Sequence, residues 1–307
     1  METPAVAVAH RFEVSGPRFR QLAFAAAAML VLIVASGTTV RMTGSGLGCT
    51  HWPTCGGIQD PLPKSYHSYV EFGNRVISAF TVLSTLLVCA AAWLTPGLGR
   101  RGRLLATAAF VGTLGQAPLG AITVYYDLNP YLVISHLLLS MTVLGIGVLV
   151  ALEASRLVRG PAATLPALAR AGGAVLLLAV GVLVVTGTLS TAAGRFPGSS
   201  GTTVVPRLGD FYDSVWLHVR AVAAFGIVFV VLAGWAWWNR REHGWLVRAC
   251  AGLLAILLVQ MGIGEFQYRN YGTVPWWLVV LHVVTAAALF GWTVGLAARL
   301  WRPVRLD

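Results

Sequence analysis

The sequence is poor in charged residues. Asp, Glu, Lys and Arg make up 11% of its 307 residues, against about a quarter in soluble globular proteins, while 57% of the residues are hydrophobic. This composition excludes a soluble protein and indicates an integral membrane protein. No glycine-rich pattern lies between an expected strand and a helix, which excludes a nucleotide-binding motif of that kind. No small-residue cleavage pattern follows the first apolar run, so we expect that run to be a span rather than a cleaved signal peptide.

Apolar runs of roughly 20 residues, each long enough to cross a hydrocarbon layer about 30 Å thick, recur along the chain. We therefore predict an all-α membrane protein with eight transmembrane helices. The expected spans lie near residues 21–40, 70–94, 104–124, 131–152, 171–190, 212–238, 245–265 and 275–299.

The arginines around the spans predict the orientation. Fifteen of the 22 basic residues precede span 1, follow span 8, or lie between spans 2 and 3, 4 and 5, or 6 and 7. By the positive-inside rule these segments and both termini are cytoplasmic, and we expect a multi-pass protein of the bacterial plasma membrane. The net charge of +11 then reflects topology and attraction to the lipid bilayer, with no nucleic-acid partner. The fifteen are Arg11, Arg18, Arg20, Arg100, Arg101, Arg103, Arg156, Arg159, Arg170, Arg240, Arg241, Arg248, Arg299, Arg302 and Arg305.

The second half of the chain repeats the first. Residues 116–120 are matched by 260–264 at an offset of 144, and Ser36-Gly-Thr38 is matched by Thr186-Gly-Thr188 at an offset of 150. Because four spans separate equivalent positions, the halves keep the same sidedness. This predicts two tandem four-helix bundles related by a pseudo-twofold axis along the membrane normal. The predicted units are 1–152, a cytoplasmic linker at 153–170, and 171–307.

Two of the four cysteines, Cys49 and Cys55, lie in the first outside loop, which faces an oxidising compartment where disulfides persist. A disulfide between them is the favoured interpretation. Free thiols are the main alternative. A metal site that also uses His51 is a weaker one, because structural zinc sites usually have closer cysteines and four ligands. We expect Cys89 and Cys250, which fall inside spans, to pack as small apolar residues.

The seven histidines fall into two groups. Four lie outside the spans, where we expect solvated side chains: His10, His51, His67 and His243. The other three lie within the first two turns of spans 4, 6 and 8, which all enter from the outside: His136, His218 and His282. Their rings therefore share one depth near the outer boundary. Ionisable residues inside spans usually line a site or pair with one another.

Two imidazoles on different helices of a four-helix unit can hold one haem iron between them, and the bundle core supplies apolar walls. We therefore predict that His218 and His282 bind a haem in the second half. The alternative is that each ring only hydrogen-bonds a neighbouring helix. In the first half, the position 144 residues before His218 is Asn74, so the repeat offers no second histidine to His136.

Several motifs coincide in this chain. The segment Thr43-Gly-Ser-Gly-Leu-Gly-Cys49 is followed by Trp52-Pro53 and Cys55, the segment Glu71-Phe-Gly-Asn-Arg75 opens span 2, and histidines open spans 4, 6 and 8. Together with eight spans in two parallel halves, these motifs resemble the haem A synthase family over essentially the whole chain. The loop with its cysteine pair is the most specific part of the resemblance.

The resemblance implies an oxidoreductase that oxidises a methyl substituent of haem O to the formyl group of haem A, for cytochrome oxidase. It implies a structural haem b held by His218 and His282, with substrate haem O and product haem A in the N-terminal half beside His136. Implied partners are haem O synthase, which is a farnesyltransferase, cytochrome oxidase assembly factors and an electron donor. A homo-oligomer is a further expectation.

In the family, a glutamate and a histidine three residues later open span 2. Here Glu71 matches and Asn74 departs, which leaves His136 as the expected ligand of the substrate iron. We favour an open sixth coordination position on this iron. The alternatives are coordination through Asn74 and coordination through His67. Glu71 is the expected catalytic residue, because a carboxylate beside the substrate can relay protons or stabilise a cationic intermediate. A salt bridge with Arg75 or a favourable helix N-terminal charge is the alternative.

Haem propionates need positive partners at the membrane edge, and arginine binds carboxylates with paired donors. Four arginines lie near the outer boundary, where a lipid headgroup contact is the alternative: Arg41, Arg75, Arg220 and Arg269. Arg75 and Arg220 are our candidate cofactor-binding residues among them. The resemblance also places the cysteine pair near the substrate site, where a disulfide stiffens a loop over the pocket or handles electrons.

Two other classes of protein share some of these features. A membrane b-type cytochrome uses the same histidines for electron transfer alone. A transporter built from tandem repeats uses intramembrane polar residues as a substrate path. An enzyme converts added haem O to a formyl haem, a cytochrome does not, and a transporter has no haem absorption band.

Overall fold

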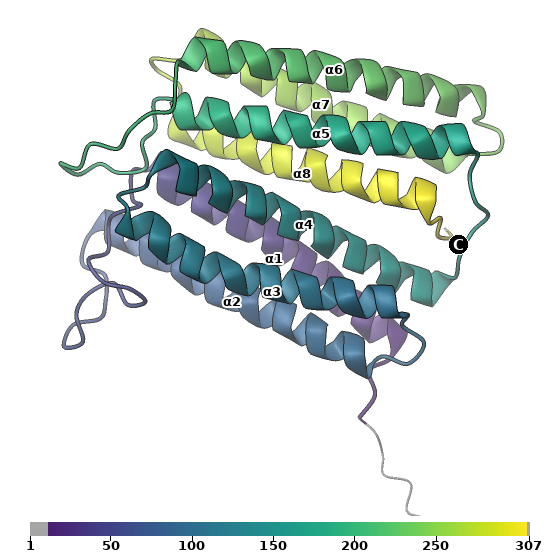
Figure 1. Cartoon of the computed structure of the whole chain (residues 1–307), viewed down its shortest axis with the longest axis horizontal. Coiled ribbons are helices and arrows are strands. Elements are labelled where there is room, and N and C mark those ends of the chain that lie inside the picture. The colour runs from purple at the N-terminus through teal and green to yellow at the C-terminus, as the bar shows by residue number, and fades with distance from the viewer. Residues whose placement is uncertain (1–11, 306–307) are drawn as a thin grey trace, which may run out of the picture.

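The computed structural model describes residues 12–305, and eight long α-helices hold most of them (Figure 1). All eight are long and apolar enough to cross a membrane, which confirms the predicted all-α membrane fold and its eight spans. The predicted cytoplasmic residues His10 and Arg11 lie outside the described residues. The helices are α1 (Gly16–Met42), α2 (Tyr66–Leu94), α3 (Arg100–Tyr125), α4 (Pro130–Arg159), α5 (Ala167–Ala193), α6 (Phe211–Trp238), α7 (Gly244–Arg269) and α8 (Trp276–Trp301).

Short polar side chains fix the first turns of α4 and α6. The Asn129 side chain caps α4 directly before Pro130, whose ring suits the first turn of a helix. The Asp210 side chain caps α6 by accepting a hydrogen bond from the Asp213 N–H (3.0 Å). These caps set the start of the two turns that carry a histidine in each helix.

The chain forms two four-helix bundles that lie side by side (Figure 1). Helices α1–α4 pack together in the first bundle and α5–α8 in the second. Between the bundles α4 meets α8, while α1 packs against α8 and α4 against α5. Since α1 corresponds to α5 and α4 to α8 in the repeat, this arrangement is consistent with the predicted twofold relationship of the halves.

Small residues allow α4 and α8 to approach closely at the junction. A Cβ atom at Gly145 would lie 3.2 Å from the Phe290 ring, and a Cβ atom at Gly291 or Gly295 would lie 3.5 Å from Val148. A buried apolar cluster from α1, α4 and α8 fills the same region. Close approach through glycine is the usual way in which membrane helices associate.

Helix α4 continues to Arg159 and α5 begins at Ala167, so the connection between the bundles is 160–166, shorter than the predicted linker. Glu153 lies past the apolar run of α4 and pairs with Arg101 of α3 (3.4 Å) and with Arg302 (3.0 Å). These pairs satisfy the charge and let the helix continue. The start of α1 and the end of α8 lie at this same end of the bundles (Figure 1).

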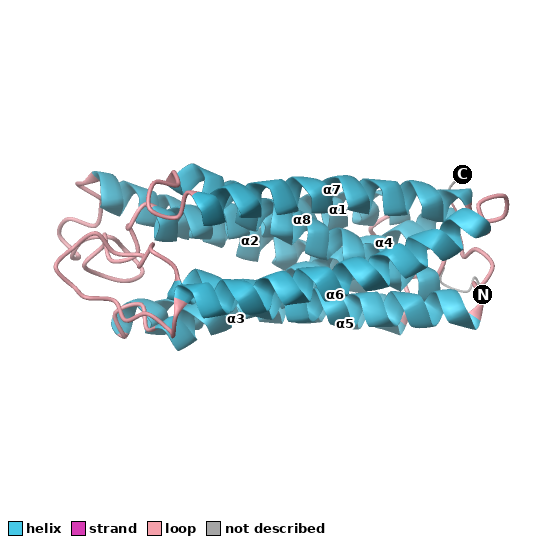
Figure 2. Ribbon diagram, turned by 90° about the horizontal axis from the view of Figure 1, so that it is seen from above, coloured by secondary structure: helices cyan, strands magenta, loops and turns pink. Residues whose placement is uncertain are grey.

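The opposite end carries the long α1–α2 and α5–α6 connections, and we call it the disulfide end (Figure 2). The two connections are joined by backbone hydrogen bonds. The Gly46 N–H donates to the Gly198 carbonyl (2.7 Å), and the Ser200 N–H donates to the Gly44 carbonyl (2.9 Å). The bundles therefore hold each other at this end through their loops as well as through their helices.

Candidate functional site

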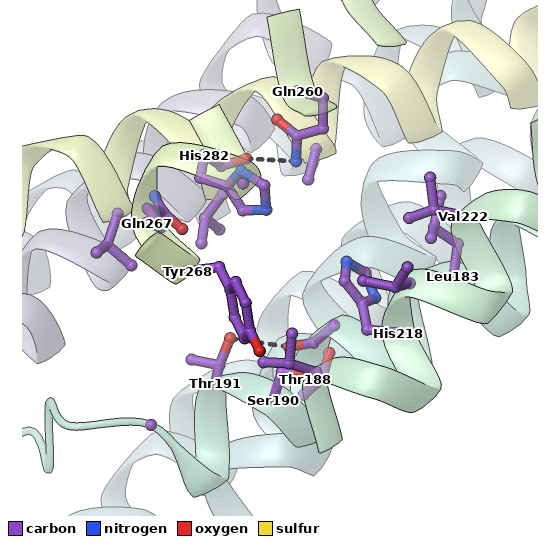
Figure 3. Close-up of a pocket in the computed structure, with 18 of the residues that line it drawn as sticks. Leu183, Thr188, Ser190, Thr191, His218, Val222, Gln260, Gln267, Tyr268 and His282 are labelled. Carbon is purple, nitrogen blue, oxygen red and sulfur yellow. Dashed lines mark hydrogen bonds between the residues drawn. The ribbon is translucent and has the colours of Figure 1, made fainter. Parts of the chain in front are cut away.

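A cavity of about 880 Å³ lies in the second bundle near the disulfide end (Figure 3). Helices α6 and α7 pack against each other much less than their counterparts α2 and α3 do, which leaves this space open. His218 and His282 project into it from α6 and α8, on opposite sides (Figure 3). Met42 and Met141 of the first bundle complete one wall. The fold thus brings the two predicted ligands of the second half together in one largely apolar cavity.

The His218 ring is oriented by α5. Its Nδ1 lies 3.0 Å from the Thr186 hydroxyl oxygen. That hydroxyl donates its own hydrogen to the Val182 or Leu183 carbonyl (3.0 and 3.1 Å), so its oxygen accepts from the His218 Nδ1–H. The proton on Nδ1 leaves the lone pair on Nε2, which is the tautomer that binds a metal.

Gly187, the next residue on α5, makes room for this ring. A Cβ atom at Gly187 would lie 3.0 Å from His218 Cε1. We expect Gly187→Val to displace the imidazole and to lower the affinity for a haem in this cavity by about ten- to a hundredfold, the usual range for second-shell changes at metal sites. Haem content per purified chain measures the effect.

Gly181→Val is the matched control, because Gly181 lies on the same helix and has open space where its Cβ would be. Equal haem loss in both variants would show that helix α5 merely tolerates valine poorly. Full haem retention in Gly187→Val would contradict the orientation of His218 by α5.

The His282 ring is oriented by α7 in a similar manner. A Cβ atom at Gly264 would lie 3.2 Å from His282 Cε1, and Gln260 Nε2 donates to the His282 carbonyl (2.9 Å). Thr285 in turn donates to Gln260 Oε1. His282 Nδ1 is buried and has no hydrogen-bond partner within residues 12–305. Its ring is therefore not committed to a hydrogen bond between helices, which was the alternative interpretation.

The first bundle repeats this arrangement around His136 of α4. A Cβ atom at Gly120 would lie 3.5 Å from His136 Cε1, and Gln116 Nε2 donates to the His136 carbonyl (3.3 Å). Gln116 also donates to Ser140 on α4 (2.9 Å). His136 Nδ1, like its counterpart in the second bundle, is buried without a partner in the described part of the chain. The sequence repeat is therefore a repeat of side-chain contacts as well.

Asn74 occupies the place of His218 in the first bundle. Its Oδ1 accepts a hydrogen bond from the Ser36 hydroxyl (2.6 Å), and a Cβ atom at Gly37 would lie 3.8 Å from the same oxygen. Ser36 and Gly37 are the repeat counterparts of the threonine and glycine that orient His218. The asparagine thus lies in a notch of the kind that holds an imidazole in the other bundle.

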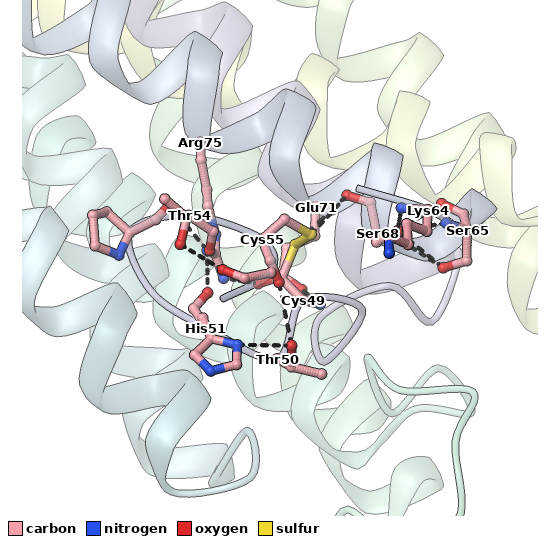
Figure 4. Close-up of a disulfide and its surroundings, with 12 residues drawn as sticks. Cys49, Thr50, His51, Thr54, Cys55, Lys64, Ser65, Ser68, Glu71 and Arg75 are labelled. Atoms are coloured by element: carbon pink, nitrogen blue, oxygen red, sulfur yellow. Dashed lines mark hydrogen bonds and ion pairs between the residues drawn. A yellow bond between two sulfur atoms is a disulfide. The ribbon is translucent and has the colours of Figure 1, made fainter. Parts of the chain in front are cut away.

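Glu71 of α2 holds the disulfide loop, 43–65 (Figure 4). Its side chain is buried, with 4% of the residue exposed, and its Oε2 accepts from the Cys49 N–H (2.8 Å). Its Oε1 pairs with Arg75 Nη2 (2.5 Å), so the predicted alternative of a salt bridge is present. Arg75 Nη1 donates to the carbonyls of His51 (2.7 Å), Pro53 (3.1 Å) and Thr54. One ion pair therefore fixes both ends of the cysteine segment.

The disulfide between Cys49 and Cys55 is present, which confirms the favoured interpretation of this pair over a metal site. Both cysteines are buried, and the backbone N–H of Thr50 donates to the Cys55 carbonyl (3.0 Å). The disulfide loop is thus a compact segment held on the first turns of α2. Cys89 lies half-buried in α2 and Cys250 is buried in α7, as predicted for small packing residues.

His67 does not offer a free nitrogen to a metal. Its Nδ1 lies 2.9 Å from the Ser45 hydroxyl and its Nε2 lies 3.0 Å from the Ser200 hydroxyl. The ring therefore links the loops of the two bundles, and the predicted alternative of His67 as an iron ligand does not fit this arrangement. The two remaining described histidines lie elsewhere: exposed His51 contacts Thr50, and His243 stacks on Trp235.

The arginines near the disulfide end differ in their surroundings. Arg220 is exposed and lies over the Trp216 ring, and Arg269 pairs with Glu265 (2.5 Å). Arg41 reaches from α1 to the second bundle, where its Nη2 donates to the Thr191 carbonyl (3.0 Å). Arg207, in the α5–α6 loop, donates to the carbonyl of Arg195, which lines the cavity. Sequence reasoning missed this side chain, because no span boundary or repeat drew attention to it.

Comparison with known proteins covers the same helices. Residues 20–294 match the COX15-CtaA family, described as cytochrome oxidase assembly protein. A haem A synthase of Lysinibacillus sphaericus (strain C3-41) is 25% identical over 262 residues, covering 76% of this chain and 84% of that protein. The haem A synthase of Geobacillus kaustophilus (strain HTA426) is 24% identical over 280 residues, covering 86% and 85%. That of Bacillus cereus (strain AH187) is 30% identical over 113 residues, 36% of each chain.

Proposed function

The chain belongs to the COX15-CtaA family of cytochrome oxidase assembly proteins and is homologous to haem A synthases, which are oxidoreductases, and we propose how its two bundles divide the work. The second bundle holds a structural haem b between His218 and His282. The first bundle receives haem O and oxidises one of its methyl substituents to the formyl group of haem A. The observation that carries this proposal is the pair of imidazoles facing one apolar cavity (Figure 3).

The cavity suits a haem b in its size and in its donor set. A volume of about 880 Å³ with largely apolar walls is typical of a cofactor site. Thr186 keeps the Nε2 lone pair of His218 free, and the His282 ring has no competing partner on Nδ1 among the described residues. When bound, this haem supplies a one-electron carrier next to the wall formed by α1 and α4 of the first bundle.

The first bundle presents a single imidazole to its substrate. His136 is positioned by Gln116 and Gly120 as His282 is by its counterparts, whereas Asn74 offers an amide oxygen that already accepts from Ser36. The substrate iron therefore keeps an open sixth position. An incompletely ligated macrocycle enters and leaves more readily, which suits a haem that is substrate and product rather than cofactor.

The disulfide loop roofs the substrate site, and Glu71 with Arg75 holds it there. In this position Glu71 also serves the reaction, relaying a proton or stabilising positive charge that develops as the methyl group is oxidised. Arg75 and Arg220 remain candidate propionate partners.

Glu71→Ala is expected to lower haem A formation by at least about tenfold, because it removes the acceptor for the Cys49 N–H and the carboxylate together. Haem b content should stay at the wild-type level, since the second bundle is untouched. The measurement is the ratio of haem A to haem O in cells that supply haem O, together with haem b in the purified protein.

Glu71→Gln separates the two roles of this residue. The amide keeps an acceptor for the loop and loses the negative charge. Output close to wild type would assign Glu71 to positioning alone, and output as low as in Glu71→Ala with an intact disulfide would assign it a charge-dependent role. Unchanged haem A output in both variants would show that Glu71 neither positions the loop for the reaction nor takes part in it through its charge.

The charge distribution supports an orientation with the disulfide end outside the cell and both termini in the cytoplasm of a bacterium. Haem O synthase supplies the farnesylated substrate, cytochrome oxidase assembly factors accept the product, and a separate donor provides electrons. A homo-oligomer is compatible with these roles.

The function is tested by adding haem O and an electron source to the purified protein in lipid, in aerated buffer so that dioxygen is present as the oxidant. The pyridine haemochrome spectrum should shift to that of a formyl haem. A haem absorption band without conversion would favour a b-type cytochrome, and the complete lack of a haem band would favour a transporter.

A further inference from the structure

Two arginines from different bundles lie against residues that line the cavity. Arg41 ends α1 of the first bundle, and Arg207 lies in the α5–α6 loop of the second. The two side chains contact residues only four positions apart at the end of α5, Thr191 and Arg195. Arg41 Nη2 donates to the Thr191 carbonyl (3.0 Å), and Arg207 Nη2 donates to the Arg195 carbonyl (2.7 Å). Backbone carbonyls hold the two groups in place without neutralising either charge.

Further donors of this pair have no acceptor. Arg41 Nε and Arg207 Nη1 are buried and lack a hydrogen-bond partner in residues 12–305, and no carboxylate of that range forms a salt bridge with either residue. Burial lowers the pKa of Arg207, while the nearby Tyr271 raises it. Two like charges that are partly removed from water are costly unless an anion compensates them. The donors and the charge therefore both call for a missing anion.

The cavity is lined by the residues that hold the pair, while Arg41 and Arg207 themselves are not part of its lining. Thr191 and Arg195, whose carbonyls hold the two guanidinium groups, line it, as does Tyr271 beside Arg207. Met42, the neighbour of Arg41, lines it as well. The two acidic residues in the lining, Asp213 and Glu265, pair with neither arginine. The anion that this pair fits is thus carried by whatever molecule fills the cavity.

We propose that Arg41 and Arg207 together bind a carboxylate of the macrocycle held by His218 and His282. The inference rests on the proposed haem b site and names the side chains that recognise the edge of the haem. Guanidinium groups suit this role because they bind carboxylates with paired donors.

The repeat explains why this carboxylate site belongs to the second bundle. Arg41 lies 150 residues before Thr191, the same offset that relates Ser36 to Thr186. Arg41 therefore donates to the carbonyl of its own repeat counterpart, across the junction of the bundles. At this repeat position the first half has Arg41 and the second half has Thr191. The first bundle therefore supplies a cation to the haem of the second bundle. A change in α1 is then expected to weaken a haem that α1 does not ligate.

The test compares haem b with its dimethyl ester, in which both propionates are esterified. Haem-free protein in lipid nanodiscs is titrated with each form, as wild type, as the double variant Arg41→Gln with Arg207→Gln, and as Arg240→Gln. Arg240 is an exposed arginine at the opposite end of α6 and controls for the change of charge. Wild type and Arg240→Gln should bind haem b at least about tenfold more tightly than the ester, the range for a charged hydrogen bond. The double variant should lose most of this preference for the free acid.

A double variant that keeps the full preference for the free acid would overturn the proposal. A double variant whose affinity falls by the same factor for both forms would also overturn it, because the arginines would then serve folding or bind a lipid phosphate. If the double variant is not recovered, equal affinity of the wild type for haem b and its ester overturns the proposal by itself. The absorption spectrum tests the iron ligands separately. A bis-imidazole spectrum of wild type with either form of haem supports His218 and His282 as ligands, independently of the result for the arginines. Its lack would instead defeat the proposed haem b site.

Discussion

Replacing either His218 or His282 with alanine is expected to lower the affinity of the protein for haem b by more than about a hundredfold. The loss of a residue that binds the iron directly costs more than a change in the residues that orient it. Each imidazole enters the cavity alone from its own helix, and no other described histidine lines this cavity. Haem per chain and the low-spin ferric signal in the electron paramagnetic resonance spectrum measure the result.

His136→Ala is the matched control for this experiment. It removes the equivalent imidazole of the first bundle, in the same turn of the equivalent helix, so it tests whether any histidine at that depth matters for haem b. It should leave haem b in place and abolish haem A formation. Full haem b in both His218→Ala and His282→Ala would refute the ligand assignment.

Asn74→His is expected to convert the substrate site into a second bis-histidine site. The notch is already present, because Ser36 can accept from Nδ1–H as Thr186 does and Gly37 leaves room for the ring. A second strong ligand should trap haem O or haem A in the first bundle and lower turnover by at least about tenfold, comparable to other losses at a reacting centre. Retained substrate haem and haem A output are the quantities to measure.

Asn74→Gln controls for the size of the new side chain, because it keeps an amide and adds no metal ligand. It should bind no extra haem. A rise of haem A output in Asn74→His would mean that the asparagine is a tolerated loss, and the open sixth position would then have no part in the reaction.

Much of the architecture follows from the sequence. The eight spans follow from hydropathy, and the repeat follows from offsets that the structure turns into matching contacts, such as Gln116 and Gln260 on the carbonyls of their histidines. The disulfide follows from the location of Cys49 and Cys55 in a loop that the charge distribution predicts to lie outside. In each case the cause is local or periodic, which a single sequence displays.

The remaining features depend on contacts between distant segments. Helix α4 outruns its apolar stretch because Glu153 finds Arg302 from the far end of the chain. His67 was expected to be solvated, yet it bonds Ser200, 133 residues away. Arg207 lies in a polar loop whose sequence resembles any other loop, and its place against the cavity lining arises only from the packing of two bundles. Such pairings carry no periodicity and escape a reading of one sequence.

The opening between α6 and α7 likewise has no counterpart in sequence periodicity, since α2 and α3 are no more apolar than α6 and α7 and yet pack closely. The sequence shows that the two bundles differ at one predicted ligand position, which holds Asn74 in the first bundle and His218 in the second. The structure adds that they differ in how far two helices separate. Both differences agree with the proposal that one bundle retains a haem and the other exchanges one.

The most direct test of this division is the electron paramagnetic resonance spectrum of the oxidised wild-type protein before and after one equivalent of haem O is added. The account predicts a low-spin bis-imidazole signal beforehand and an additional high-spin signal, from haem with one histidine, afterwards. A second low-spin signal after addition, or no low-spin signal beforehand, would contradict it.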